Sequence, residues 1–205
     1  MQDSPKSFII ADDHPLFRGA LKEALRQLFG DIQIAEASSF ESLQSAVAET
    51  KDPDLVLLDL CMPGVCGFSG LIFLRGQYPS YPVVVVSANE DSAIISRSMQ
   101  YGASGYITKS SSIDEIAQII QVVLGGDVWI PDCVNHLSPD PETGEEKEFA
   151  DRLSSLTPKQ FMVLGHIVDG LLNKQIADVM DISEATVKAH VTAILNKLGV
   201  NSRTQ

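Results

Sequence analysis

Two runs of four consecutive apolar residues constrain the fold most strongly, LVLL at 55–58 and VVVV at 83–86. A strand with one face in water alternates apolar and polar side chains, whereas a strand covered on both faces is apolar throughout. Strands of the second kind occur in parallel sheets that carry helices on both sides. The two runs therefore predict neighbouring inner strands of a parallel α/β sheet.

The first 130 residues extend this pattern into five repeats of a short apolar run followed by a helical segment. Strands are predicted at 8–11, 32–35, 55–58, 83–86 and 105–107, and helices at 16–28, 40–49, 67–77, 92–101 and 113–124. Five such repeats predict a doubly wound sheet of five parallel strands. We therefore assign a first domain to residues 1–130.

Residues 131–153 have a different composition. They contain three prolines and an acidic run, with 7 acids against 2 bases, and they show no apolar period. We interpret this segment as a linker. Its acidic run is either a solvated tether or a mask for a basic module that follows.

Residues 154–205 show only helical patterns. Thr157, Pro158 and Gln160 form a capping box with proline at the first helical position. A short helix is predicted from Asn173 and a longer one after Ser183, which together give a helix-turn-helix. The chain is thus predicted to be an α/β domain followed by a small all-α domain.

The net charge of −12 argues at first against a nucleic-acid partner, because phosphate contacts need Lys and Arg. The charge is unevenly distributed, however. Residues 1–131 hold 16 acids and 8 bases, whereas residues 154–205 hold 4 acids and 5 bases. The last segment alone has a charge balance compatible with DNA.

The sequence contains neither an apolar run long enough for a membrane span nor a signal-peptide pattern at its start, so we expect a cytoplasmic protein with no membrane partner. Its three cysteines, Cys61, Cys66 and Cys133, are an odd number without the spacing of a metal site. This usage favours a reducing compartment and argues against a disulfide or thiolate-metal role for Cys61 and Cys66.

Chemically active side chains follow four of the five predicted strands. They are Asp12, Asp13, Asp59, Ser87 and Lys109. The carboxyl ends of parallel strands share one edge of a sheet, where ligands bind. Three carboxylates brought together there require a cation, and Mg²⁺ prefers such oxygen ligands. Since a hydroxyl and an ammonium suit phosphoryl oxygens, the set predicts an aspartate that accepts a phosphoryl group with metal help.

Residues 6–130 resemble the receiver domain of bacterial response regulators, on the stretches FIIADDHP, DLVLLDLCMPGVCG, VVVVSA and GASGYITKS. The resemblance implies a flavodoxin-like receiver in which a sensor histidine kinase phosphorylates Asp59. It also implies that Asp13, Asp59 and the backbone carbonyl of Cys61 bind Mg²⁺ directly, and that Asp12 acts mostly through water.

The same resemblance assigns the groups that respond to the phosphoryl group. Ser87 would hydrogen-bond a phosphoryl oxygen and Lys109 would pair with it electrostatically. Tyr106 occupies the position of an aromatic residue that swings inward when the hydroxyl is drawn to the phosphoryl group. For His14, which follows the acid pair, two roles stay open: a metal ligand, or a residue that orients the loop.

Residues 156–205 resemble the LuxR-type helix-turn-helix of the NarL/LuxR response regulators, on NKQIA, ISEATVKAHVTAILNKLGV and SRTQ. The resemblance implies that Glu184, Lys188 and Ala189 face base edges in the major groove of double-stranded DNA. It further implies phosphate contacts from three side chains, Lys174, His190 and Lys197.

Lys188, Thr192 and Asn196 lie at i, i+4 and i+8 and form a stripe that can enter the groove. Thr192 replaces a lysine that some relatives carry, which predicts weaker binding. One nearly neutral module would bind weakly, so paired half-sites and a homodimer in the active form are expected. The family's last helix supplies a dimer contact, and we expect this sequence to end inside it.

These patterns favour a DNA-binding response regulator, with two alternatives. An aspartate-nucleophile phosphatase would need a D-x-D pair, but position 61 is Cys, so we do not expect an enzyme. A phosphorylation-independent pseudo-receiver would bind DNA constitutively, although all five site residues are present. Binding of beryllofluoride with Mg²⁺ distinguishes this alternative from a phosphorylated regulator.

Overall fold

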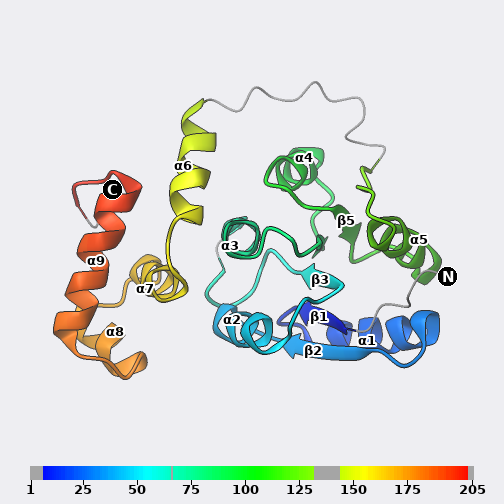
Figure 1. The fold of residues 1–205 in the computed structure, drawn as a ribbon, viewed down its shortest axis with the longest axis horizontal. Helices are drawn as coiled ribbons and strands as arrows, with labels where there is room; N and C mark the ends of the chain where they lie inside the picture. The colour runs from blue at the N-terminus through cyan, green and yellow to red at the C-terminus, as the bar shows by residue number, and fades with distance from the viewer. Residues whose placement is uncertain (1–6, 66, 132–143, 203–205) are drawn as a thin grey trace. The chain divides into compact units, whose positions relative to one another are not determined.

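The structure is a computed structural model of the 205-residue chain, and it describes residues 7–65, 67–131 and 144–202 (Figure 1). The chain divides into two compact units, residues 1–141 and 142–205. Outside the described residues lie Cys66, Cys133 and residues 132–143 of the predicted linker. The expected last helix falls partly on residues 203–205, which also lie outside them. No helix in the described ranges has both the length and the apolar character needed to span a bilayer.

The first unit contains a five-stranded parallel sheet with strand order β2-β1-β3-β4-β5, which confirms the predicted doubly wound fold. Its strands are β1 (Ser7–Ala11), β2 (Gln33–Ala37), β3 (Leu55–Leu58), β4 (Val83–Ser87) and β5 (Gly105–Thr108). The strand order reverses between β1 and β3. A crevice forms at this switch point, outside the carboxyl ends of the strands.

Five helices cover the two faces of the sheet (Figure 1). They are α1 (Pro15–Phe29), α2 (Phe40–Glu49), α3 (Ser69–Gln77), α4 (Ser92–Gln100) and α5 (Ile113–Leu124). Helices α1 and α5 lie on one face, and α2, α3 and α4 lie on the other. Each predicted helix and strand is present with its ends shifted by at most two residues, the uncertainty expected at such boundaries.

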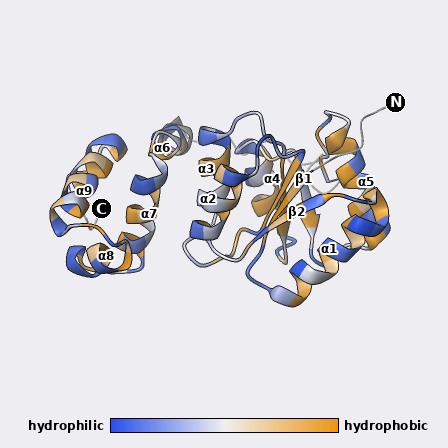
Figure 2. Ribbon diagram, turned by 60° about the horizontal axis from the view of Figure 1, so that its bottom comes forward, coloured by the Kyte–Doolittle hydropathy of each residue, from blue (hydrophilic) through white to orange (hydrophobic). Residues whose placement is uncertain are grey.

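The sheet is buried on both faces, as the two apolar runs predict. Every residue of β3 and β4 is buried, and Figure 2 shows hydrophobic residues concentrated in the strands. On the α1–α5 face, Leu57 and Val84 pack with Leu25 of α1 and Ile120 of α5. The strands therefore form a rigid support for side chains at their carboxyl ends.

The second unit contains α6 (Gly144–Ser154), α7 (Pro158–Val168), α8 (Asn173–Val179) and α9 (Glu184–Leu198). Thr157 and Gln160 form the predicted capping box at the start of α7. Helices α8 and α9 both pack against their neighbours through a small core. The buried side chains of that core include Leu153, Leu156, Phe161, Val163, Ile176, Val187, Ile194 and Leu198.

The predicted linker at 131–153 requires a correction, because residues 144–154 form α6 and belong to the second unit. Arg152 pairs with Glu148 one turn earlier at 2.6 Å, and Leu153 is buried. Arg152 Nη1 also donates to the carbonyl oxygen of Leu198 at the end of α9, at 2.9 Å. The three prolines all precede this helix, so the composition of the whole segment concealed its helical second half.

Gly199 ends α9 in a left-handed conformation, with φ of 70°. A Cβ atom at this position would lie 2.6 Å from Arg152 Nη1. We expect Gly199→Ala to lower the free energy of unfolding by about 1–2 kcal/mol, from left-handed strain and displacement of Arg152. Urea unfolding measures this loss.

Gly19→Ala is the matched control. Gly19 lies in α1, has no heavy atom within 4 Å of a built Cβ, and does not have a positive φ. This substitution should stabilise by about 0.5–1 kcal/mol, because alanine loses less backbone entropy in a helix. If Gly199→Ala is as stable as the unsubstituted protein, the proposed strain at the end of α9 is absent.

Candidate functional site

Asp59 follows β3 directly and is held between β1 and β3. Its backbone N–H donates to the carbonyl oxygen of Ala11 at 2.8 Å. Its side chain is buried, and Oδ1 accepts from the backbone N–H of Cys61 at 3.1 Å. The carboxylate is therefore fixed at the carboxyl edge of the sheet, next to the switch point.

Asp12 and Asp13 follow β1 at the same edge. The N–H of Asp12 donates to Ala37 at the end of β2 at 3.0 Å, and its buried Oδ1 accepts from the N–H of His14 at 2.7 Å. One ligand atom from each of Asp12, Asp13, His14 and Asp59 lies within 4.8 Å of the others. The structure thus brings together the three predicted carboxylates.

Lys109 follows β5 and compensates the charge of this cluster. Its Nζ lies 2.7 Å from Asp12 Oδ2 and 2.7 Å from Asp59 Oδ2, and 5.0 Å from the ring centroid of Phe17. Burial by itself would lower the pKa of Lys109, but hydrogen bonds to Asp12 and Asp59 outweigh burial and raise that pKa. Lys109 is therefore a permanent cation in this site.

His14 lies at the open side of the cluster and is 65% exposed. Its Nδ1 is 2.7 Å from Asp13 Oδ1, 3.3 Å from Asp12 Oδ1 and 3.5 Å from Lys109 Nζ. Its backbone N–H binds the Asp12 carboxylate, so His14 orients the loop through its main chain. The main-chain contact fits a role in orienting the loop, and the place of the His14 side chain in the cluster fits a metal ligand, so both roles stay predictions.

The donor set fits a hard divalent cation. Beyond their ion pairs with Lys109 and His14, Asp12 Oδ2 and Asp13 Oδ1 are buried and accept no hydrogen bond from the described residues. The Cys61 thiol is a poor additional ligand, because burial and the nearby Asp59 charge raise its pKa and keep it protonated. Carboxylate and carbonyl oxygens, the ligands that Mg²⁺ prefers, are what the site offers.

Ser87 ends β4 with its side chain buried. Its Oγ accepts from the backbone N–H of Asn89 at 3.2 Å, which leaves the hydroxyl hydrogen for a further acceptor. Tyr106 of β5 is 2% exposed, and its hydroxyl donates to the carbonyl oxygen of Asn89 at 2.7 Å. The aromatic ring thus occupies the inward position, and one residue, Asn89, joins both predicted switch side chains.

A cavity of about 490 Å³ opens over Asp59, large enough for a phosphoryl group with its ligands. Its lining residues are His14, Asp59, Cys61, Ser87, Ala88, Asn89, Glu90 and Lys109. The predicted acceptor carboxylate, hydroxyl and ammonium therefore face the same space. Asp12, Asp13 and Tyr106 are not among the lining residues, but Asp12 contacts Lys109 and Tyr106 contacts Asn89, which both line the cavity.

In the second unit, the residues predicted to face base edges lie on the exposed side of α9. Glu184, Lys188, Ala189 and Thr192 are all exposed. Lys188 Nζ lies 2.9 Å from Glu184 Oε1, and Thr192 Oγ1 donates to the Lys188 carbonyl at 3.0 Å. These side chains form a single stripe along the helix, which can reach a groove.

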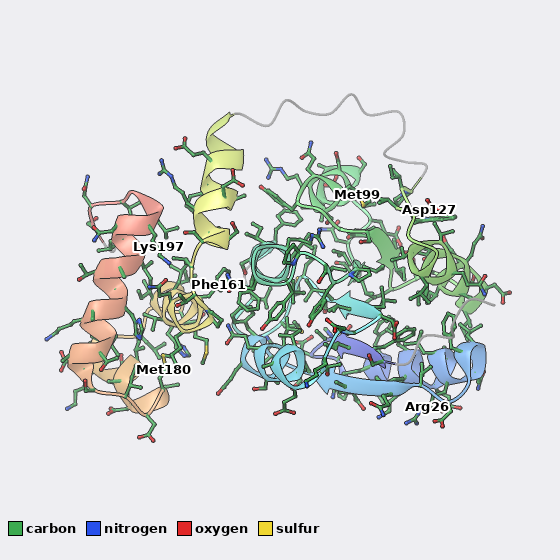
Figure 3. The ribbon with its side chains drawn as sticks, in the orientation of Figure 1. Arg26, Met99, Asp127, Phe161, Met180 and Lys197 are labelled. Carbon is green, nitrogen blue, oxygen red and sulfur yellow. The ribbon has the colours of Figure 1, made fainter. Side chains whose placement is uncertain are left out.

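The three residues predicted to contact phosphates differ in their surroundings. Lys174 is exposed on α8 and His190 is half-buried on α9. Lys197, labelled in Figure 3, is bonded inside the unit: its Nζ donates to the Ser155 carbonyl at 2.7 Å and to Gln160 Oε1 at 2.9 Å. Lys197 therefore joins α9 to the α6–α7 loop, a role that the spacing of charges along α9 did not predict.

Comparisons with protein families decide the identity of both units. Residues 8–121 match the family model of the response regulator receiver domain, and residues 154–205 match that of bacterial regulatory proteins of the luxR family. The chain belongs to the luxR-family response regulators. This confirms both resemblances noted in the sequence, and it places the protein in a family of transcription regulators rather than of enzymes.

Curated relatives align with the chain across both units. The chain is 42% identical to the glycerol metabolism activator of Pseudomonas putida, over 96% of this chain and 91% of the relative. It is 34% identical to the nitrate/nitrite response regulator NarP of Escherichia coli strain K12, over 98% and 92%. RcsB of Salmonella enterica serovar Typhimurium, solved with promoter rprA and phosphomimetic BeF3⁻, has a similar fold, with a TM-score of 0.57, 22% identity and coverage of 97% and 94%.

Two further residues shape the receiver site of this response regulator although their spacing did not single them out. Asn89 contacts Ser87 and Tyr106 through its backbone N–H and carbonyl groups. Any residue type could make these contacts, so the identity of the residue at position 89 did not indicate them. Arg18 Nη1 donates to the Asp12 carbonyl at 2.6 Å, and Arg18 Nε lies 3.1 Å from Glu36 Oε2. Arg18 lies in the first turn of α1, five residues after Asp13, and this closeness in sequence to the acid pair is the signal that could have indicated it.

Glu36 of β2 forms ion pairs with Lys22 and with Arg18, the residue that contacts the Asp12 carbonyl. The hydrogen bond from Lys22 lowers the pKa of Glu36, with a further contribution from Arg18 against the opposing effect of burial. Since the folded-state pKa is lowered, the stabilisation is present above the ordinary glutamate pKa of about 4.3 and is lost as pH falls through the lowered value. We expect Glu36→Gln to flatten the acid limb of the stability profile.

Thermal unfolding at a series of pH values below 6 checks this expectation (about two units above that pKa). Glu41→Gln is the control, because Glu41 is exposed in the first turn of α2. Identical acid limbs for Glu36→Gln and the unsubstituted protein would show that the two cations do not hold Glu36 ionised.

Proposed function

We propose that this response regulator is phosphorylated on Asp59 by a sensor histidine kinase in the cytoplasm, with Mg²⁺, and that phosphorylation switches its binding to DNA. The observation that carries the proposal is the shared cavity, in which the Asp59 carboxylate, the Ser87 hydroxyl and the Lys109 ammonium face one space. These are the nucleophile, the hydrogen-bond donor and the counter-charge that an aspartyl phosphate needs.

In the phosphorylation step, an Asp59 oxygen forms a bond to phosphorus as the bond from phosphorus to the kinase histidine nitrogen breaks. The nitrogen keeps the electron pair of that bond and takes up a proton. Asp13, Asp59 and the Cys61 carbonyl would hold Mg²⁺, and Asp12 would act through water. The metal ion, when bound, neutralises charge on the phosphoryl oxygens. Lys109, already 2.7 Å from Asp59, supplies the remaining positive charge.

The switch follows from the bonds of Ser87. Its hydroxyl can donate to a phosphoryl oxygen while it still accepts from Asn89, and Tyr106 holds the other side of Asn89. Asn89 Oδ1 accepts from the N–H of Asp91 at 2.8 Å, and Asp91 caps the start of α4. A shift at Ser87 is thereby transmitted through two short contacts to α4. The phosphoryl group adds a hydrogen bond to Ser87 that the unphosphorylated protein lacks. It can therefore shift the population of the receiver from its inactive toward its active conformation.

In the second unit we propose that α9 enters the major groove of a promoter. With 5 bases and 4 acids in residues 154–205, one copy has little electrostatic affinity for DNA. Two copies on paired half-sites, as a homodimer of the phosphorylated protein, would supply enough contacts. RcsB of Salmonella, which has a similar fold, was solved bound to a promoter with BeF3⁻, which supports DNA binding by a protein of this fold.

The test has two parts. Intact-protein mass spectrometry after incubation with a small acyl phosphate and Mg²⁺ should show one added phosphoryl group, mapped to the peptide that contains Asp59. Fluorescence anisotropy should then show tighter binding of duplex DNA with beryllofluoride and Mg²⁺ than with Mg²⁺ alone. DNA binding that is equally tight in both conditions would instead establish the phosphorylation-independent regulator.

A further inference from the structure

The exposed stripe of α9 carries an unusual set of groups for a helix that approaches DNA. Glu184, Lys188 and Thr192 succeed one another at intervals of four residues, and Ala189 lies beside them. One of these groups is an exposed carboxylate, which phosphates repel. We therefore expect the DNA to present a hydrogen-bond donor to this carboxylate.

Glu184 and Lys188 form an ion pair at 2.9 Å, with side chains 47% and 64% exposed. An exposed pair of this kind contributes little to stability. Its chemistry, however, matches one kind of base pair: a carboxylate accepts from the N4 amino group of cytosine, and an ammonium donates to O6 and N7 of guanine. The pair therefore carries the two complementary groups that read G·C.

Thr192 presents a methyl group rather than a hydroxyl to the solvent side. Its Oγ1 donates to the Lys188 carbonyl at 3.0 Å, so the hydroxyl is directed along the helix. Ala189 adds a second exposed methyl on the same side of α9. Methyl groups in the major groove contact the C5 methyl of thymine.

We infer that α9 reads its half-site through Glu184 on a cytosine, Lys188 on a guanine within about two base pairs, and the methyl groups of Thr192 and Ala189 on a thymine beyond them. Four residues of helix span roughly 6 Å, and base pairs are stacked about 3.4 Å apart, which sets this spacing. The inference rests on the proposed function and adds the identity of the bases. Glu184 lies in the first turn of α9, where recognition helices approach base edges.

Glu184 has two effects in this account. At a matching site its carboxylate accepts from cytosine, and at other sites it stays unpaired and repels the backbone. Glu184→Gln should therefore relax the preference for cytosine and at the same time tighten binding to unrelated DNA. A residue with only a structural role would not change these two properties in opposite directions.

The experiment uses the full chain with Mg²⁺ and beryllofluoride. Selection from a random duplex library gives the preferred half-site, and anisotropy measures each single base-pair change. In the unsubstituted protein, replacing the cytosine should weaken binding about tenfold. In Glu184→Gln the same replacement should have almost no effect, while the preference for guanine at the Lys188 position is kept.

Glu148→Gln is the matched control, since Glu148 is in a carboxylate–cation pair of the same i, i+4 spacing on α6 and is not part of the exposed stripe of α9. This variant should keep every base preference. Selection of the same half-site, with the same cytosine preference, by Glu184→Gln would overturn the inference. Failure of the unsubstituted protein to bind DNA more tightly with beryllofluoride would instead refute the proposed function.

A second measurement tests the thymine contact. Uracil in place of that thymine removes only the C5 methyl, and should weaken binding by the unsubstituted protein about fourfold. Thr192→Ser keeps the hydroxyl and loses the methyl, so it should bind the thymine and uracil sites equally, whereas Thr192→Val should still distinguish them. Equal binding of the two sites by the unsubstituted protein would remove thymine from the assignment.

Discussion

Replacing Asp59 with asparagine will abolish phosphorylation of this response regulator and the effect of beryllofluoride on its DNA binding. The amide has nearly the shape of the carboxylate and fits the same buried position, but its oxygen is a far weaker nucleophile and carries no charge for a metal ion. The variant keeps the Ser87 and Lys109 side chains of the cavity, and Lys109 keeps its ion pair with Asp12. We expect no phosphorylated species by intact-protein mass spectrometry, under conditions that convert most of the unsubstituted protein.

Asp52→Asn is the control for this substitution. Asp52 precedes β3, is exposed and has φ of 47°, a conformation that asparagine adopts readily. It should be phosphorylated at the normal rate and should bind DNA as before. If Asp59→Asn still gains a phosphoryl group at any described aspartate of the cluster, Asp12 or Asp13 must be the acceptor, and the assignment of Asp59 is wrong.

Lys109→Met will cost about 3 kcal/mol of stability in the absence of metal ions. Breaking a buried ion pair by removing one partner typically costs about 3–5 kcal/mol, because the remaining charge is buried without compensation. Here the loss leaves the buried carboxylates of Asp12 and Asp59 without the cation that lies 2.7 Å from each. Methionine has a similar length but no charge, so the change removes the ion pairs together with the cation–π contact to Phe17 while it keeps most of the side-chain volume.

Adding Mg²⁺ should restore much of that loss, because a divalent cation replaces the missing charge among three carboxylates. Urea unfolding with and without Mg²⁺ measures the difference, which should be larger in Lys109→Met than in the unsubstituted protein. Lys109→Arg, which keeps the charge, is the control and should need no metal ion to remain stable. Equal stabilisation by Mg²⁺ in all three proteins would show that Lys109 does not compensate the carboxylates.

The fold of the first unit was predictable because its signals are local and agree with one another. The run LVLL is fully buried as β3, and α5 covers residues 113–124 as predicted. The chemically active residues were also predictable, because parallel strands place their carboxyl ends at one edge. Asp12, Asp59 and Lys109 come from three strands, yet they meet within hydrogen-bonding distance.

The features that the sequence did not predict depend on contacts between distant parts of the chain, which residue types alone do not reveal. Lys197 has the charge and position of a phosphate contact, but two acceptors in the α6–α7 region bind its ammonium. The inward position of Tyr106 depends on a backbone carbonyl, that of Asn89, seventeen residues earlier. Helix α6 was hidden because the prolines before it dominate the composition of the segment.

The bond between Arg152 and Leu198 has a practical consequence for building hybrid regulators. A designer who joins a foreign receiver at residue 154, where the luxR-family match begins, would discard Arg152 and its hydrogen bond to the carbonyl at the end of α9. A joint placed ahead of Gly144 would keep α6 with α9, which it contacts. The second unit, taken as a transferable domain, is therefore one helix longer than the segment that matches the luxR-family model.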